Sequence, residues 1–343
     1  MKKLYIFLIP IFLFSCKKDE PIEPAQAPLQ TIQPGDGIFV TNEGNFQFGN
    51  AKVSFLRFSN SVVTEDVFQS ANNLPLGDVC QGMSFINGAA YVVVNNSGKI
   101  EVVRPSDFVS LATITGFTSP RYILQVSATK AYVSDLYGNG LSIVNLTNNT
   151  ITGHITIPGW TEKMIIVNGQ VFVSNFQRDK LYVVDGATDN VTDSITVLKG
   201  GNSVVTDANG KLWLLCAGDF QTSSPGGLFR IDVLNHAVEW SAVFPAGNSP
   251  NNLNIDPTGN SLYFLNSNVY KMTISDSLAP SVAFITSSGR NYYSISVHPT
   301  TGDLYISDAI DYVQRGRVYR FNSSGTELSY FLAGVTPGGI WFY

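Results

Sequence analysis

Four carboxylate side chains stand at the edges of strand-like segments, where carboxylates can hold a divalent cation. They are Glu43, Asp78, Asp135 and Glu162. Oxygen ligands of this kind bind calcium or magnesium, as in metal-dependent hydrolases of the lactonase type. The four residues occupy unmatched positions in their segments, so the sequence offers no convincing set of three ligands. A lactonase-like hydrolase is therefore an alternative and not the expectation.

Nucleophilic and transition-metal chemistry has less support. The three histidines, His154, His236 and His298, lie far apart, and no His-x-x-x-His or Cys-x-x-Cys pair occurs. Zinc sites are usually built from such short-range pairs. No Ser-His-Asp arrangement is recognisable either, so we expect a protein that is not an enzyme, with no catalytic residue, metal or cofactor. Cys80 and Cys216 stand in apolar, strand-like segments, where we expect two buried free thiols.

Aromatic, guanidinium and amide side chains in loop-like segments are the better candidates for a binding site. Loops seldom carry many large aromatic residues, so their recurrence here favours a function on the loops. Aromatic rings combined with hydrogen-bonding groups suit a large, partly apolar small molecule. The expected ligand-binding residues are Asn45, Phe46, Phe48, Arg121, Tyr122, Tyr137, Trp160, Phe176, Arg178, Phe220, Arg290, Tyr292 and Tyr312.

The start of the chain points to lipid attachment at Cys16. Two lysines precede an apolar run at 4–14, which is too short to span a bilayer, because a spanning helix needs about 20 residues. The run ends in Ser15-Cys16 and resembles the bacterial lipobox, and the charged residues that follow resemble a surface-export signal. The expected organisation is a lipoprotein signal peptide at 1–15, the lipidated cysteine with a Pro-rich tether at 16–36, and one folded domain at 37–343.

The elements that position these residues are short strands. No long stretch shows a 3.6-residue apolar period, whereas many short stretches alternate and end at Gly, Asn or Asp. One stretch recurs seven times, and its clearest form is an aromatic or aliphatic strand ending in Ser, Thr or Leu and then Asn or Asp. The copies lie at 39–42, 91–94, 132–135, 172–175, 213–216, 263–266 and 305–308.

The recurring stretch is the second strand of a four-stranded unit, whose strands we call A, B, C and D. Seven units over 37–343 average about 44 residues, which is typical of propeller blades. The sequence therefore predicts an all-β, seven-bladed β-propeller of four-stranded antiparallel blades. The first unit lacks strand A, while 340–343 resembles a strand A with no B after it. We expect this C-terminal strand to complete the first blade and close the ring.

In a propeller, the B–C loops and the D–A connections lie on one face around the central channel, and the expected ligand-binding residues belong to these loops. The segment Asn42-Glu43-Gly44-Asn45, together with the Tyr-Val-Ser-Asp type of strand, resembles the YncE-like propeller lipoproteins. More narrowly, it resembles surface lipoproteins that capture cobalamin for a TonB-dependent transporter. The resemblance covers nearly the whole mature chain but supplies no residue-level motif, so the site residues rest on loop position.

The resemblance implies that cobalamin or another corrinoid binds to the loop face and passes to a TonB-dependent outer-membrane transporter. It also implies a lipid-anchored protein of the outer membrane, exposed at the cell surface. A protein-interaction scaffold at the cell envelope is a second alternative beside the hydrolase. Nucleic acid is not an expected partner, because 21 basic residues face 26 acidic ones and no basic stripe is present.

Overall fold

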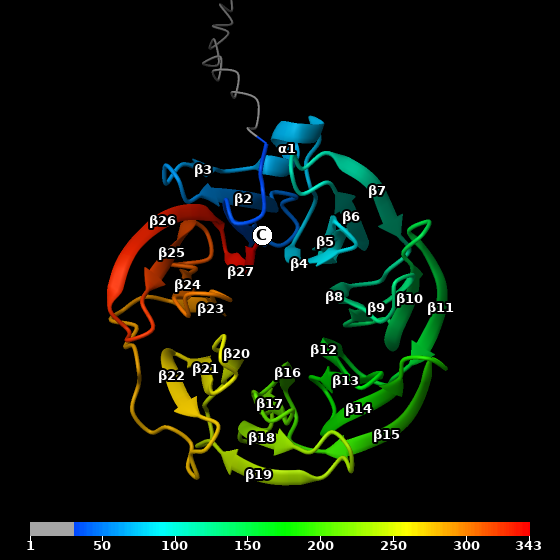
Figure 1. Cartoon of the computed structure of the whole chain (residues 1–343), viewed down its shortest axis with the longest axis vertical. Coiled ribbons are helices and arrows are strands. Elements are labelled where there is room, and N and C mark those ends of the chain that lie inside the picture. The colour runs from blue at the N-terminus through cyan, green and yellow to red at the C-terminus, as the bar shows by residue number, and fades with distance from the viewer. Residues whose placement is uncertain (1–30) are drawn as a thin grey trace, which may run out of the picture.

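Seven antiparallel sheets form a ring in the computed structural model, which describes residues 31–343 (Figure 1). The predicted seven-bladed β-propeller is confirmed. The expected signal peptide and Cys16 lie outside the described residues. Among residues 31–343, no helix combines the length and the apolar character needed to cross a membrane.

The blades follow one another along the chain, each with its A strand innermost (Figure 1). Blade 1 contains β27 (Pro337–Phe342), β1 (Gly37–Asn42), β2 (Lys52–Arg57) and β3 (Val63–Thr64). Blade 2 contains β4 (Cys80–Ile86), β5 (Ala89–Val94), β6 (Lys99–Val103) and β7 (Ser110–Thr115), with the short 3-10 helix η1 (Asn95–Ser97) after β5. Blade 3 contains β8 (Pro120–Gln125), β9 (Lys130–Asp135), β10 (Gly140–Asn145) and β11 (Thr150–Thr156).

The remaining four blades repeat this order. Blade 4 contains β12 (Thr161–Val167), β13 (Gln170–Asn175), β14 (Lys180–Asp185) and β15 (Asn190–Thr196). Blade 5 contains β16 (Gly201–Thr206), β17 (Leu212–Cys216), β18 (Gly227–Ile231) and β19 (Val238–Val243). Blade 6 contains β20 (Asn251–Ile255), β21 (Ser261–Asn266) and β22 (Asn268–Thr273). Blade 7 contains β23 (Tyr292–Val297), β24 (Leu304–Asp308), β25 (Arg315–Phe321) and β26 (Glu327–Val335).

The hydrophobic core of the described residues is divided into seven clusters, each between two neighbouring blades. Successive side chains on a strand point to opposite faces of its sheet. On β9, Tyr132 therefore packs toward blade 4, while Val133 packs toward blade 2. This is why the recurring B strand is apolar at consecutive positions. Both of its faces are buried, so its pattern is a continuous run and not a simple alternation.

The C-terminal strand closes the ring, as predicted. In blade 1, β27 pairs with β1, so that Val40 lies opposite Ile340. Ile340 is 4% exposed and belongs to the cluster between blades 7 and 1. Part of the expected tether also lies on the ring: Ile32 is fully buried between blades 1 and 2, and its N–H donates to Ser106 O at 2.7 Å.

Two elements differ from the uniform repeat. Blade 6 has three strands, and a single bridge between Val269 and Ile285 stands in place of its outer strand. Pro280 lies in that segment, and proline has no N–H to donate to a ladder. In addition, the helix α1 (Val67–Asn72) follows β3, with its N-cap Asp66 accepting from Gln69 N. Six residues are too few to show a helical period, so this helix could not be predicted from the sequence.

The two cysteines are buried free thiols, as expected. Cys80 packs between blades 1 and 2, and Cys216 packs between blades 4 and 5. Burial raises the pKa of both thiols, and that of Cys216 reaches about 12. Both therefore remain protonated and behave as small apolar side chains.

Candidate functional site

Every inner strand of the ring carries a β-bulge near its first residues. In each A–B pair, one extra residue on the inner strand breaks the register, as between Thr161 and Met164 of β12 or between Pro120 and Ile123 of β8. The other five inner strands shift at the equivalent place. A bulge leaves residues without a ladder partner and re-aims their side chains. The seven bulges therefore lie at one level of the ring.

The bulged residues line a single cavity of about 970 Å³ in the centre of the ring. We call them the bulge ring, and all of them contribute to the cavity wall. They are Gln81, Arg121, Tyr122, Glu162, Lys163, Asn202, Asn252, Leu253, Tyr293 and Gly338. A β-bulge repeated in seven blades thus places mostly polar side chains on the cavity wall, although the blades pack on one another through apolar side chains.

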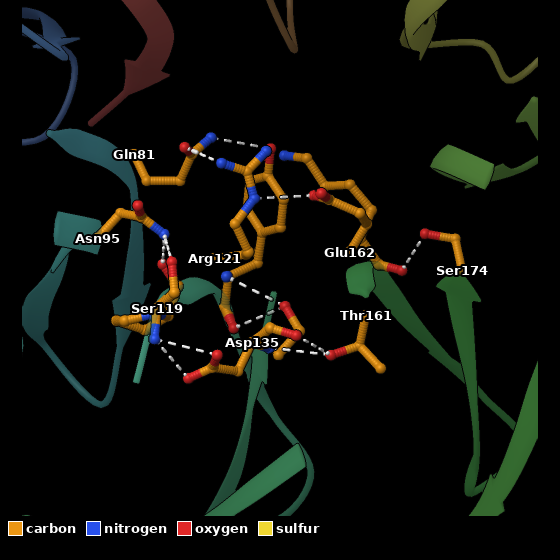
Figure 2. A network of polar contacts seen from close by, with 12 residues as sticks. Gln81, Asn95, Ser119, Arg121, Asp135, Thr161, Glu162 and Ser174 are labelled. Atoms are coloured by element: carbon orange, nitrogen blue, oxygen red, sulfur yellow. Dashed lines mark hydrogen bonds and ion pairs between the residues drawn. The ribbon is translucent and has the colours of Figure 1, made fainter. Parts of the chain in front are cut away.

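Arg121 is the centre of the polar contacts in the bulge ring. Figure 2 shows its guanidinium between Gln81 and Glu162, and its Nε donates to Glu162 Oε2 at 3.0 Å. Gln81 in turn donates from Nε2 to the hydroxyl of Tyr122 at 3.3 Å. Burial opposes the charge of Arg121, but Glu162 outweighs it and holds the Arg121 pKa above its usual value. Burial raises the pKa of Tyr122 to about 12, so this hydroxyl stays neutral.

The Asp or Asn that ends a B strand fixes the loops beside a bulge. Asp135 accepts from Ser119 N at 3.0 Å in the D–A connection (Figure 2). It also accepts from Tyr137 N at 2.9 Å in the B–C loop. Asp308 accepts from Asn291 N and Ile310 N in the same way, whereas Asn175 donates to Pro158 O in the D–A connection and accepts from Arg178 N in the B–C loop. The last residue of the repeated sequence therefore positions the loops that flank the cavity.

Blade 1 completes the wall with a glycine and a neighbouring glutamate. Tyr293 donates to the carboxylate of Glu43, with 3.0 Å to each oxygen. A Cβ atom on Gly338 would lie 2.6 Å from Glu43 Oε1, so a side chain there would displace the Glu43 carboxylate. Burial raises the pKa of Glu43 despite the hydrogen bond from Tyr293 and the charge of Arg121. Burial and the Glu43 charge likewise raise the pKa of Tyr293.

The other residues of the Asn42-Glu43-Gly44-Asn45 segment hold blade 1 against blade 7. Asn42 Oδ1 accepts from Gly334 N at 2.7 Å, and its Nδ2 donates to Ser54 Oγ at 3.0 Å. Asn45 Nδ2 donates to the carbonyl of Tyr312 at 2.7 Å. The segment that carries the family resemblance thus secures the closing blades and brings Glu43 to the cavity.

Lys163 lies on two aromatic rings at the cavity wall. Its Nζ is 3.9 Å from the ring centroid of Tyr122 and 5.6 Å from that of Trp341. Aromatic faces attract cations electrostatically. Burial lowers the pKa of Lys163 to about 8, so the ammonium form prevails at neutral pH.

Asparagines form the opposite wall, on blades 5 and 6. Asn202 Nδ2 donates to Pro250 O at 2.9 Å, and Asn252 Nδ2 donates to Tyr293 O at 3.0 Å. These bonds run from one blade to the next, so the amides both line the cavity and link the blades.

Only some of the expected ligand-binding residues reach the cavity. Arg121, Tyr122, Phe176, Tyr292 and Tyr312 line it, and they come from blades 3, 4 and 7. The expected residues that do not line it are Asn45, Phe46, Phe48, Tyr137, Trp160, Arg178, Phe220 and Arg290.

Tyr137 and Trp160 extend the wall outward through Phe176. The rings of Trp160 and Phe176 stack at 6.0 Å, and Tyr137 meets Trp160 edge-on at 5.7 Å. We call these three residues the aromatic ladder. Because Phe176 lines the cavity and Tyr137 is 60% exposed, the ladder runs from the cavity to the loop surface.

The remaining expected residues have other surroundings. Phe46, Phe48 and Phe220 are exposed loop residues, and Phe220 is 95% exposed. Arg178 is also exposed. Arg290 stacks on Tyr319 at 3.8 Å and pairs with Glu327 at 2.8 Å, so it supports blade 7 and does not line the cavity.

The four carboxylates considered as metal ligands each have a separate partner. Glu43 accepts from Tyr293, Glu162 from Arg121, and Asp135 from backbone N–H groups. Asp78 accepts from Gln47 N and from the side chain of Asn96. Within the part of the chain that the structure describes, no group of three or more His, Cys, Asp or Glu side chains is placed to hold a metal ion.

Sequence reasoning missed Gln81, Lys163 and Tyr293, and it considered Glu43 and Glu162 only as metal ligands. A weak signal was present, because Arg121-Tyr122 and Glu162-Lys163 are adjacent polar pairs at the start of strands that otherwise turn apolar. A bulge puts both members of such a pair at the cavity, which an unbroken period of two would not do.

Over residues 36–333, the chain matches the protein family described as Domain of unknown function (DUF5074). The chain belongs to this family. The matched residues begin just before β1 and end within β26, so the DUF5074 domain holds nearly the whole ring. No curated protein sequence matches the chain.

Solved structures share the fold of this DUF5074 propeller. A quinonprotein alcohol dehydrogenase-like protein from Bacteroides thetaiotaomicron is 16% identical, with a TM-score of 0.70 over 90% of this chain and 78% of that chain. A protein from Lactobacillus plantarum is 14% identical, with a TM-score of 0.68 over 90% and 99%. A dihydro-heme d1 dehydrogenase in complex with DHE is 10% identical, with a TM-score of 0.61 over 95% and 77%. At such low identities the likeness concerns the fold alone.

Proposed function

We propose that this DUF5074 propeller captures a small molecule in its central cavity, and that the ligand is cobalamin or another corrinoid. The observation that carries the proposal is the bulge ring. Ten residues from seven blades line one cavity of about 970 Å³, which is at the upper end of the range usual for small-molecule sites. Bulges are over-represented next to active sites, where they re-aim side chains.

The chemistry of the cavity wall suits a corrinoid. A corrinoid is an apolar macrocycle surrounded by carboxamide groups, so its site needs aromatic contact together with donors and acceptors for amides. Gln81, Asn202 and Asn252 provide amides, and Tyr122 and Tyr293 provide hydroxyl groups. The aromatic ladder provides an apolar surface that leads inward from the loop face.

Capture is better supported than catalysis. Each carboxylate near the cavity is already engaged by another group, and Arg121 is tied to both Gln81 and Glu162. Such a wall is preorganised for binding. A lactonase-like hydrolase would need several carboxylates to converge on one cation.

We further propose that the protein is lipid-anchored in the outer membrane and hands the ligand to a TonB-dependent transporter. The lipobox-like sequence at Cys16 supports the anchor. Exposed apolar side chains on the loop face support a protein partner there, because such groups often mark interaction sites. They include Phe48 at 77%, Phe220 at 95% and Val313 at 69% exposure.

Isothermal titration of the purified protein with cyanocobalamin tests the ligand. We expect binding at micromolar concentration or tighter. Trp160→Ala breaks the aromatic ladder and is expected to weaken binding about tenfold or more, since buried aromatic anchors dominate binding energy. Tyr330→Ala is the matched control, because Tyr330 is an exposed aromatic residue on β26, away from the cavity. Absence of binding by the wild-type protein at 100 μM would reject the corrinoid.

A further inference from the structure

The cavity contains an ammonium group that has no acceptor. Within residues 31–343, Lys163 Nζ forms no hydrogen bond and no ion pair, and its close contacts are the rings of Tyr122 and Trp341. Its neighbour Arg121, by contrast, is bonded to both Glu162 and Gln81. Of the two cations of the cavity wall, Arg121 therefore has hydrogen-bond acceptors and Lys163 has none.

The aromatic rings hold Lys163 without using its donors. A cation–π contact attracts the charge as a whole, whereas a lysine ammonium carries three N–H donors. Lys163 is half-buried, and these donors have no hydrogen-bond partner among residues 31–343. Lys163 lines the cavity, so an acceptor in the cavity can reach it.

The ion pairing of the wall leaves Lys163 unmatched. Two cations, Arg121 and Lys163, face two carboxylates, Glu43 and Glu162. Glu162 is occupied by Arg121, and Glu43 accepts a hydrogen bond from Tyr293. Neither carboxylate makes an ion pair with Lys163, so positive charge is left beside Tyr122 and Trp341.

We propose that Lys163 is an anion subsite, which binds a phosphodiester or a carboxylate group of the captured ligand beside Tyr122 and Trp341. If the ligand is cobalamin, the group is the phosphodiester of its nucleotide loop. Only this last identification rests on the proposed function. The subsite itself rests on the geometry around Lys163.

A first experiment tests the subsite without a corrinoid. The protein is labelled with ¹³C at lysine Cε, and the NMR signal of Lys163 is assigned by its absence from Lys163→Met. Dimethyl phosphate and acetate are then titrated in turn, which separates the two anion sources. We expect a saturable shift of the Lys163 signal with at least one of them in the millimolar range.

Lys271 is the internal control for this titration. It also lies over two aromatic rings, at 5.3 Å from Tyr263 and 5.2 Å from Phe284, but it does not line the cavity. The NMR signal of Lys271 is expected to shift no more in dimethyl phosphate or acetate than in potassium chloride at the same ionic strength. If Lys163 responds like Lys271 to both anions, the subsite does not exist.

A second experiment places the subsite in ligand capture. Wild type, Lys163→Met and Lys271→Met are titrated with cyanocobalamin and with dicyanocobinamide, which lacks the phosphodiester. We expect Lys163→Met to lose tenfold or more in affinity for cyanocobalamin and to keep its affinity for dicyanocobinamide. Equal losses for both ligands, or no loss, would overturn the phosphodiester contact. If wild type binds neither ligand, the corrinoid proposal fails, and the NMR titration still decides the subsite.

Discussion

Replacing Lys163 with methionine should make the propeller more stable at neutral pH. Methionine has nearly the length of lysine but carries no charge, so it can lie on Tyr122 and Trp341 as an apolar side chain. In the wild type, burial lowers the Lys163 pKa from its usual 10.5 to about 8. The lowered pKa means that holding the charged form in the folded state is unfavourable.

The expected gain follows from two opposing contributions. The lowered pKa corresponds to a destabilisation of about 3 kcal/mol, at ~1.4 kcal/mol for each pKa unit. The substitution also removes the attraction of the ammonium to two aromatic rings, which is worth about 1–2 kcal/mol. The net stabilisation at pH 7 is therefore about 1–2 kcal/mol, which raises the melting temperature by roughly 2 °C or more for a chain of this size.

The sign of the pH dependence gives a sharper test. Below about pH 8, Lys163 is protonated in both the folded and the unfolded chain, so the destabilisation is fully present. Between about pH 8 and 10.5, the unfolded chain still binds the proton that the folded chain has lost, so wild-type stability rises with pH. The advantage of Lys163→Met should therefore shrink over this interval.

Thermal unfolding of wild type, Lys163→Met and Lys271→Met at pH 7, 8, 9 and 10 measures this effect. Lys271→Met serves as the control for loss of a lysine on aromatic rings outside the cavity. A Lys163→Met protein that melts below wild type at pH 7, or a difference that stays constant with pH, would refute the reasoning.

Three further predictions concern the closure and the wall of the ring. Ile340→Ala should lower the unfolding free energy by about 2–4 kcal/mol, because it opens a void between blades 7 and 1; Leu332→Ala, on the exposed side of β26, should change it by less than about 1 kcal/mol in the same urea titration. Asn42→Ala should lower the unfolding free energy by about 1–3 kcal/mol, because the buried N–H of Gly334 then has no acceptor. Hydrogen exchange should then be faster at the Gly334 N–H than in the wild type. Glu162→Gln removes the counter-charge of Arg121 and should destabilise the ring by about 3 kcal/mol, measured by calorimetry at pH 7.

The fold could be predicted from the sequence because its determinants are local and repeated. Each B strand can be recognised by its apolar residues followed by Asn or Asp. The first unit lacks strand A and the chain ends in a strand without a following B strand, which predicted that the C-terminal strand closes the ring. Blade 6 departs from the repeat where Pro280 and a Ser-rich segment replace a strand. The signature of the B strand persists in β21, so the blade was found although its outer edge differs.

The site was less predictable, because a bulge adds one residue without changing the local composition. Loop position selected Arg121, Tyr122 and Phe176, which line the cavity. It also selected Phe46 and Phe220, which are exposed on the loop surface. Whether a side chain faces the cavity depends on the register of the inner strand, and that register is set by pairing with a neighbour and not by the strand alone.

The bulges have a consequence for how this family can diversify. Apart from Leu253, the residues of the bulge ring belong to none of the seven interblade clusters of the described chain, and they lack ladder partners. Substitutions there can change what the cavity accepts while leaving the apolar packing between blades untouched, and they affect polar bonds such as those that Arg121, Asn202 and Asn252 make to neighbouring blades. Cavity wall and apolar core are thus encoded at separate positions of the same strands, so one ring can evolve toward new ligands by exchanging one or two residues in each blade.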